Sequence, residues 1–243
     1  METEKNCEVE GGQNREIEKG GKEIIVISVG GSLIVPDFID SDFLREFRKV
    51  ILKQNNRFII ISGGGKTARK YQEAAKKVIE LTREDLDWLG IHGTRLNAHL
   101  IRTVFKEEAH PKIIKNPNEK VEFNKKILVA SGWKPGFSTD YDAVLLAKNF
   151  GIKKLINLTN VDYVYDKDPN KFEEAKPIKE ISWKDFRELL PKEWNPGLNT
   201  PFDPVAAKEG EKLGLEVVTL NGKNMKNFED YLNGKEFIGT KIN

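Results

Sequence analysis

The stretch Ile60-Ile61-Ser62-Gly63-Gly64-Gly65-Lys66 decides the expected fold, because it joins an apolar strand to a helix through three glycines. The run Phe58–Ile61 is rich in β-branched residues, which predicts a buried strand. The segment from Lys66 to Leu81 is rich in Ala, Lys, Glu and Gln, which predicts a helix. Without side chains, the backbone N–H groups of the turn could close on an anion in front of the helix N-terminus. The stretch therefore predicts a phosphate-binding turn.

A second glycine turn follows the strand expected at Ile24–Val29, where the chain continues as Gly30-Gly31-Ser32. A tight strand–helix connection is the alternative explanation for this turn. Two such turns in one domain suggest two phosphate sites that face each other. A phosphoryl-transfer enzyme needs that arrangement, because its catalysis rests on alignment and charge neutralisation.

Apolar runs and helical patterns alternate along the rest of the chain, with a short connector expected at Asp85–Leu89. Further strands are expected at Lys112–Ile114, Ile127–Ala130, Lys154–Leu158, Val217–Leu220 and Phe237–Lys241. Further helices are expected at Phe43–Leu52, Asn97–Glu108, Tyr141–Phe150, Ile181–Leu190 and Asp203–Leu213. This alternation predicts an α/β fold, a three-layer α/β/α sandwich around a mainly parallel sheet. We expect one domain over residues 23–243 and a disordered extension over residues 1–22, which is polar and charged.

Composition excludes several classes of protein. With 40 Lys and Arg against 38 Asp and Glu, the net charge of +2 gives no whole-chain argument for nucleic acid or for an acidic membrane. One cysteine, Cys7, excludes an internal disulfide and is typical of a reducing compartment. We see no secretion signal and no apolar stretch long enough to span a bilayer, which predicts a cytoplasmic protein.

The motifs of two common nucleotide-binding families are missing. Neither glycine turn has the G-x-x-x-x-G-K-[ST] spacing of a P-loop or the G-x-G-x-x-G spacing of a dinucleotide-binding fold. The three histidines have no metal-ligand spacing. A third signal is the loop Thr159–Pro169, where tyrosines could pack beside a nucleobase and aspartates could hold Mg²⁺, unless it is only a surface turn.

Six segments in order resemble the amino acid kinase superfamily, and within it the archaeal type of uridylate (UMP) kinase. They are V-G-G-S-L at Val29–Leu33, G-G-G-K-T-A-R-K-Y at Gly63–Tyr71, D-W-L-G-I-H-G-T-R-L-N-A at Asp87–Ala98, G-W-K-P-G-F-S-T-D at Gly132–Asp140, T-N-V-D-Y-V-Y-D-K-D-P at Thr159–Pro169 and F-D-P-V-A-A-K at Phe202–Lys208. The resemblance implies transfer of the γ-phosphoryl of ATP to UMP with Mg²⁺, in a homo-hexamer. The helix faces at Phe43–Leu52 and Leu96–Val104 could belong to its interfaces or to the core.

The resemblance also implies roles for individual residues. The phosphate-transfer path and ATP phosphates would be lined by Ser28, Val29, Gly30, Gly31, Ser32, Gly65 and Arg69. The ATP adenine and ribose would lie against Thr159, Tyr165 and Asp168. Asp87 would bind the UMP ribose, and the rest of UMP would contact Gly64, Gly132, Trp133, Lys134, Pro135, Gly136, Phe137 and Ser138. The implied catalytic residues are Lys66, Arg69, Ser32 and Asp203, and no metal ligand is assigned.

Several positions depart from the family pattern. Ser28-Val29 stands where bacterial members place a phosphate-binding lysine, so Lys66, Arg69, Mg²⁺ or another lysine must neutralise the phosphates. Trp133-Lys134 and Tyr163 are also unusual. Another small-molecule kinase of the superfamily therefore remains an alternative. An isopentenyl phosphate kinase is less compatible, because its usual histidine after the acceptor glycines is absent. A non-catalytic nucleotide-binding relative is the other alternative.

Overall fold

A computed structural model describes residues 23–169, 171–191 and 200–243. Its strands are β1 (Ile24–Val29), β2 (Arg57–Ser62), β3 (Ala109–Ile114), β4 (Ile127–Ala130), β5 (Lys154–Thr159), β6 (Val164–Tyr165), β7 (Pro177–Ile178), β8 (Glu180–Ile181), β9 (Glu216–Asn221) and β10 (Thr240–Ile242). Its helices are α1 (Gly31–Ile34), α2 (Ser41–Lys53), α3 (Gly65–Lys76), α4 (Arg83–Val104), α5 (Thr139–Phe150), α6 (Trp183–Leu189), α7 (Pro204–Leu213) and α8 (Met225–Leu232). The extension expected over residues 1–22 lies outside the described residues.

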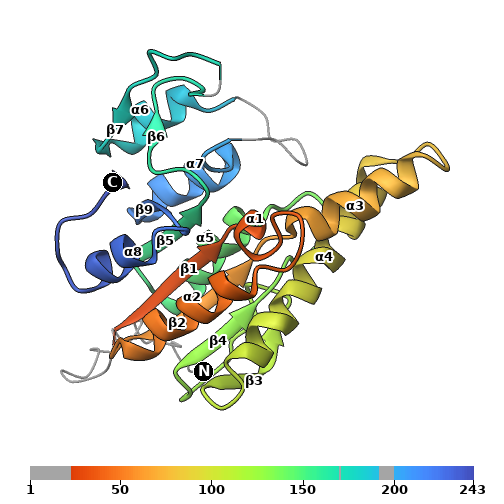
Figure 1. The fold of residues 1–243 in the computed structure, drawn as a ribbon, viewed down its shortest axis with the longest axis horizontal. Helices are drawn as coiled ribbons and strands as arrows, with labels where there is room; N and C mark the ends of the chain where they lie inside the picture. The colour runs from red at the N-terminus through yellow and green to blue at the C-terminus, as the bar shows by residue number, and fades with distance from the viewer. Residues whose placement is uncertain (1–22, 170, 192–199) are drawn as a thin grey trace, which may run out of the picture.

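A sheet with the strand order β3-β4-β2-β1-β5-β9-β10-β8 runs through the centre of the molecule (Figure 1). The pairs from β3 to β9 are parallel, and β10 pairs antiparallel with β9. Strands β6 and β7 form a separate antiparallel pair. The mainly parallel sheet that the sequence predicts is confirmed.

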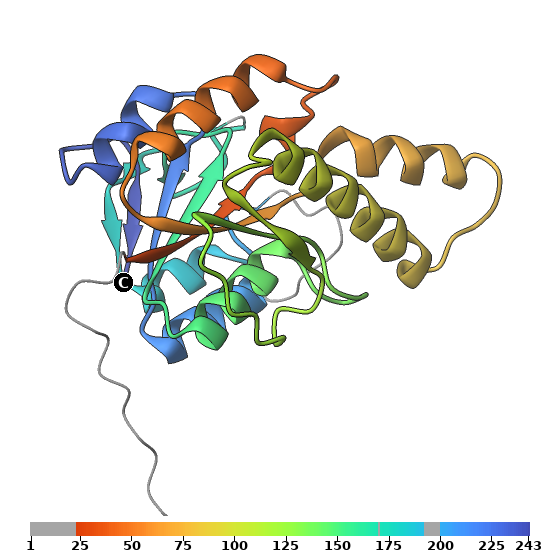
Figure 2. The same cartoon turned by 90° about the horizontal axis from the view of Figure 1, so that it is seen from below.

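Alternating side chains of the strands feed two apolar cores. From β1, Ile25, Ile27 and Val29 pack into a core with α1, α2, α4 and α8, whereas Val26 packs into a core with α5, α6 and α7. Figure 2 shows these two helical layers above and below the sheet. The expected three-layer α/β/α architecture is therefore confirmed. Helices α3 and α4 pack on each other and extend beyond the end of the sheet (Figure 1).

The expected connector at Asp85–Leu89 is wrong, because these residues lie in the first two turns of α4. Thr82 caps this helix: its Oγ1 accepts a hydrogen bond from the Asp85 N–H at 3.1 Å, and Asp85 Oδ2 accepts one from the Thr82 N–H at 3.0 Å. This reciprocal capping box satisfies two amides that have no partner inside the helix. As a result, Asp87 lies on a rigid helix instead of on a connector.

Other elements also differ from the expectation. Helix α3 begins at Gly65 and ends at Lys76, earlier at both ends than the sequence pattern predicts. Helices α1 and α8 are additional, and the C-terminal strand is confined to Thr240–Ile242. None of the described helices combines the length and apolar character that crossing a bilayer requires.

Candidate active site

The two glycine turns lie against each other at the carboxyl ends of β1 and β2, which are neighbours in the sheet. A Cβ atom on Gly31 would lie 2.0 Å from the backbone nitrogen of Gly65, and one on Gly63 would lie 2.6 Å from the nitrogen of Gly31. Gly65 also has a φ of +59°, which favours glycine. These positions therefore need glycine mainly because the two turns touch each other. The sequence alone did not reveal this reason.

A cavity of about 670 Å³ opens beside these turns. Its walls come from the two turns, the first turns of α3, the middle of α4, the loop before α5 and the start of α7. Ten of the residues expected in the site line it: Gly31, Ser32, Gly64, Gly65, Arg69, Asp87, Gly132, Phe137, Ser138 and Asp203. Gln72, Thr94, Asp140 and Thr200 line it too, although the sequence did not assign them to the site.

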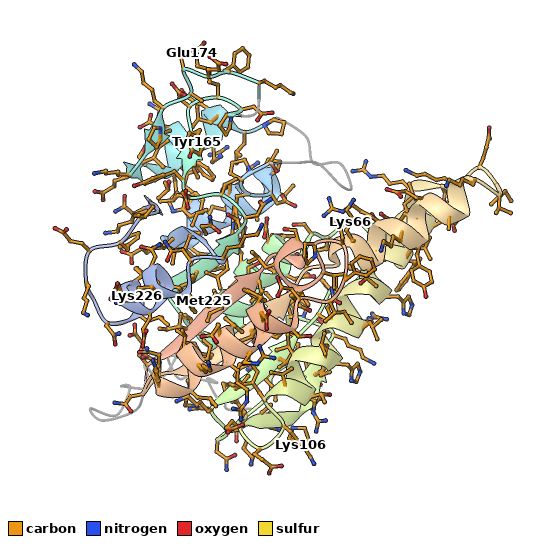
Figure 3. The ribbon with its side chains drawn as sticks, viewed as in Figure 1. Lys66, Lys106, Tyr165, Glu174, Met225 and Lys226 are labelled. Carbon is orange, nitrogen blue, oxygen red and sulfur yellow. The ribbon has the colours of Figure 1, made fainter. Side chains whose placement is uncertain are left out.

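The other expected site residues do not line this cavity. They are Ser28, Val29, Gly30, Lys66, Trp133, Lys134, Pro135, Gly136, Thr159, Tyr165 and Asp168. Lys66 Nζ lies 3.9 Å from Asp37 Oδ1, and Figure 3 shows Lys66 beside the start of α3, well separated from Tyr165 on β6. Thr159 lies at the end of β5 and its Oγ1 accepts a hydrogen bond from the Val161 N–H at 3.2 Å.

Asp140 and Asp203 form an acidic pair in the cavity wall. Asp203 is the N-cap of α7, where its Oδ1 accepts hydrogen bonds from the N–H groups of Val205 at 2.6 Å and Ala206 at 3.1 Å. Asp140 lies in the first turn of α5, and Ser28 Oγ donates to its Oδ1 at 3.4 Å. Burial and the negative charge of Asp203 raise the pKa of Asp140 to about 7.

Sequence reasoning took Thr139-Asp140 only as a helix start and so missed the role of Asp140 in the wall. A signal was present, because Ser138 caps α5 and accepts a hydrogen bond from the Tyr141 N–H at 3.1 Å. Capping places Asp140 at the N-terminal end of a helix that follows a strand end, the edge where ligands bind in such sheets. The raised pKa depends on burial and on Asp203, and the sequence does not encode either one locally.

The loop Gly132–Ser138, which leads into α5, also contributes to the cavity wall. The Gly136 N–H donates to Asp87 Oδ2 at 2.8 Å, which ties this loop to α4. Phe137 stacks on Tyr141 with ring centroids 5.3 Å apart. It also packs edge-to-face with Trp133, with ring centroids 4.8 Å apart. Lys134 Nζ lies 4.1 Å from the Trp133 ring centroid, a cation–π distance. The unusual residues of this loop thus form one aromatic cluster next to the cavity.

The charged residues in the cavity wall are mostly acidic. Among the described lining residues, Arg69 is the single cation, beside the three acidic residues Asp87, Asp140 and Asp203. No group of three or more His, Cys, Asp or Glu side chains in the described part of the chain is arranged to hold a metal ion. Mg²⁺ needs only one or two carboxylates besides substrate phosphates, so the pair Asp140 and Asp203 fits such an ion.

Comparison with known proteins gives a consistent result. Residues 23–221 match the sequence model of the amino acid kinase family. The uridylate kinase of Methanobrevibacter smithii is 35% identical over 223 residues, which cover 90% of this chain and 98% of that protein. The uridylate kinase of Pyrococcus abyssi is 35% identical over 216 residues, which cover 87% of this chain and 96% of that protein.

Among solved structures, the uridylate kinase from Archaeoglobus fulgidus superimposes with a TM-score of 0.78 and 31% identity, over 90% of this chain and 99% of that chain. The UMP kinase from Bacillus anthracis, with a TM-score of 0.73 and 20% identity, shares the fold. The resemblance that the sequence motifs carry is confirmed by these relatives. The chain belongs to the amino acid kinase family.

Proposed function

We propose that this protein is a UMP kinase, which transfers the γ-phosphoryl of ATP to UMP and gives UDP and ADP. The observation that carries the proposal is that one cavity joins both glycine turns, Arg69, Asp87 and the acidic pair. Archaeal relatives named uridylate kinase, similar over nearly the whole chain, support the same acceptor. The reaction serves the synthesis of pyrimidine nucleotides in the cytoplasm.

For this transfer, the protein must align two nucleotides and neutralise the negative charge of their phosphates. A phosphate oxygen of UMP attacks the γ-phosphorus, and the bond to the β-phosphate oxygen of ADP breaks. Arg69 lines the cavity and can contact phosphate oxygens through two N–H groups at once, whereas Lys66 does not line it and its Nζ lies 3.9 Å from Asp37 Oδ1. The backbone amides of the turns at Gly31 and Gly65 supply further donors to phosphate.

Asp140 and Asp203 are the residues that would hold Mg²⁺. Burial and the negative charge of Asp203 raise the pKa of Asp140, and a bound cation would favour its ionised form. When bound, Mg²⁺ neutralises phosphate oxygens during transfer. We propose that Asp87 and the loop Gly132–Ser138 bind the nucleoside part of UMP. The nucleoside part of ATP would be bound by Thr159, Tyr165 and Asp168.

The deciding experiment measures ADP release with UMP, CMP, acetylglutamate and isopentenyl phosphate as acceptors. We expect a clear preference for UMP. Preference for another acceptor would indicate a different small-molecule kinase of the family, and nucleotide binding without turnover would indicate a non-catalytic relative. Asp87→Asn tests the placement of UMP, because it should raise the KM for UMP at least fivefold and the KM for ATP less than twofold. Equal changes in both constants would contradict this placement.

We also propose a homo-hexamer. Three large apolar side chains on the projecting helices and just after α3 support an interface there: Tyr71 is 65% exposed, Val78 85% and Leu96 61%. The apolar face at Phe43–Leu52 instead belongs to the core, because Phe47 and Ile51 are fully buried. Light scattering after size exclusion should give the mass of six chains, and Leu96→Glu should lower it. A wild-type monomer would refute the assembly.

A further inference from the structure

Side chains of two helices fix the start of the loop Gly132–Ser138. The Gly132 N–H donates to Thr94 Oγ1 on α4 at 2.8 Å. The next amide, the Trp133 N–H, donates to Asp142 Oδ2 on α5 at 3.0 Å. Arg95 Nη2 donates to the Trp133 carbonyl at 3.1 Å. Three successive backbone groups are therefore held at the base of the loop.

Asp142 is unusual among these anchors, because its side chain is an acid that is 0% exposed in an otherwise apolar stretch of α5. Its Oδ2 bonds the Trp133 N–H, while its Oδ1 is buried and has no hydrogen-bond partner among the described residues. Such a carboxyl weakens the fold in comparison with an apolar side chain of similar shape.

Packing alone therefore does not account for an acid at this position. Its one described bond is to the loop that carries Phe137 and Ser138 to the cavity wall. At the tip of the loop, the bond from Gly136 to Asp87 is exposed to solvent, so it constrains the loop less than the buried and half-buried bonds at the base.

We propose that Asp142 is a positioning residue for the acceptor nucleotide: its carboxyl holds the Trp133 amide and so sets the loop that contacts UMP. This inference rests on the proposed function, because it assigns the Gly132–Ser138 loop to the acceptor. The carboxyl itself does not line the cavity. Its effect reaches UMP through the loop backbone, and it has no comparable bond to the ATP side.

Two variants separate positioning from folding. Asp142→Leu keeps the branched shape but removes the acceptor oxygen, and we expect about a tenfold rise in the KM for UMP, the loss typical of one buried hydrogen bond. The KM for ATP should change less than twofold, and the Tm at pH 8 should not fall. Asp142→Asn keeps an oxygen that can accept from the Trp133 N–H, so it should restore the KM for UMP to within twofold of wild type.

Asn227→Ala is the matched control. It removes two side-chain bonds to backbone, because Asn227 Nδ2 donates to the Ile238 carbonyl at 2.7 Å and Asn227 Oδ1 accepts from the Ile238 N–H at 2.7 Å. Asn227 lies in α8 and does not line the cavity. The Tm of this variant should fall while both KM values stay unchanged. A KM for UMP within twofold of wild type in Asp142→Leu, or equal rises for UMP and ATP, would overturn the proposal.

Amide hydrogen exchange of the wild-type protein without nucleotide gives a test that does not depend on activity or on the identity of the acceptor. The amides of Gly132 and Trp133 should exchange as slowly as those of the neighbouring strand β4, and the Asp142→Leu variant should expose Trp133 to faster exchange. Fast exchange of Trp133 in the wild type would refute the anchoring even if UMP were the substrate. Slow exchange together with no turnover of UMP would instead refute the proposed function alone.

Discussion

Gly31→Ala should disable the enzyme by separating the two glycine turns. The added Cβ would lie 2.0 Å from the Gly65 nitrogen, whereas real Cβ contacts are essentially never shorter than 3.0 Å. The obstacle is backbone at the start of α3, so no side-chain rotation relieves it. The turns must therefore move apart by at least 3.0 − 2.0 = 1.0 Å.

The size of the effect follows from this displacement. Both turns face the same cavity, and a misplacement of about 1 Å in groups that align reactants can reduce the rate about 100-fold. The strain of the added methyl group should lower the free energy of unfolding by about 1–3 kcal/mol. We therefore expect a folded protein whose kcat for ADP release falls about 100-fold and whose Tm falls by several degrees.

Gly151→Ala provides the matched control, because Gly151 has a φ of +66° but no atom within 4 Å of an added Cβ. It caps the far end of α5 and should lower stability by about 1 kcal/mol through backbone strain while leaving kcat unchanged. Coupled ADP-release assays and thermal unfolding measure both effects. A Gly31→Ala enzyme that keeps more than a third of the wild-type kcat would refute the reasoning, as would an equal loss of kcat in Gly151→Ala.

Three further predictions concern the charged residues of the wall. Arg69→Lys should lower kcat/KM at least tenfold in ADP-release assays, because lysine cannot make the paired contact of a guanidinium with phosphate. Asp203→Asn should keep the α7 cap and its Tm but lose activity, whereas Asp203→Ala should lose activity and about 1 kcal/mol or more of stability; equal Tm values would contradict the capping role. The pKa of Asp140 is raised in the folded state from 3.8 to about 7, so between about pH 4 and 7 the folded protein binds protons that the unfolded chain does not. Because Asp140 must ionise in a buried site, the free energy of unfolding falls as the pH rises through that range. The fall in Tm from pH 5 to pH 8 should therefore be smaller in Asp140→Asn than in the wild type. Parallel Tm profiles of the two proteins would show that Asp140 titrates normally.

The central strands β1, β2, β4, β5 and β9 were predictable because they are short apolar runs whose two faces are both buried, whereas β6, β7 and β8 were not expected. Expected strands such as Ile24–Val29 and Ile127–Ala130 coincide with β1 and β4. The start of α4 differs from the expectation although Thr82 and Asp85 carry a capping-box signature, because the polar composition of Asp85–Leu89 is also typical of a connector. The antiparallel β10 depends on its pairing with β9, a tertiary contact that no local pattern reports.

The residues of the candidate site also fall into those that local sequence predicts and those that it does not. Glycine turns, Arg69 and Asp87 belong to motifs that stand out in the chain, and they do meet in one cavity. Asp140 and Asp142 did not stand out, because their significance comes from burial and from Asp203, which lies more than sixty positions further along the chain. The local sequence shows which side chains are present. A carboxyl with a shifted pKa shows which of them the fold has brought together.

The balance of charge in the cavity bears on how two anionic nucleotides can occupy it. Three carboxylates and one arginine among the described lining residues make the empty wall unfavourable for phosphate. Burial and the negative charge of Asp203 disfavour the ionised form of Asp140. A ligand that arrives with a divalent cation removes this penalty, whereas free phosphate does not. In the proposed UMP kinase, Ser28-Val29 stands where bacterial members place a lysine, so we expect Arg69 and the cation that accompanies ATP to neutralise the phosphates. We therefore expect nucleotide binding to depend more on a divalent metal here than in family members that have the lysine.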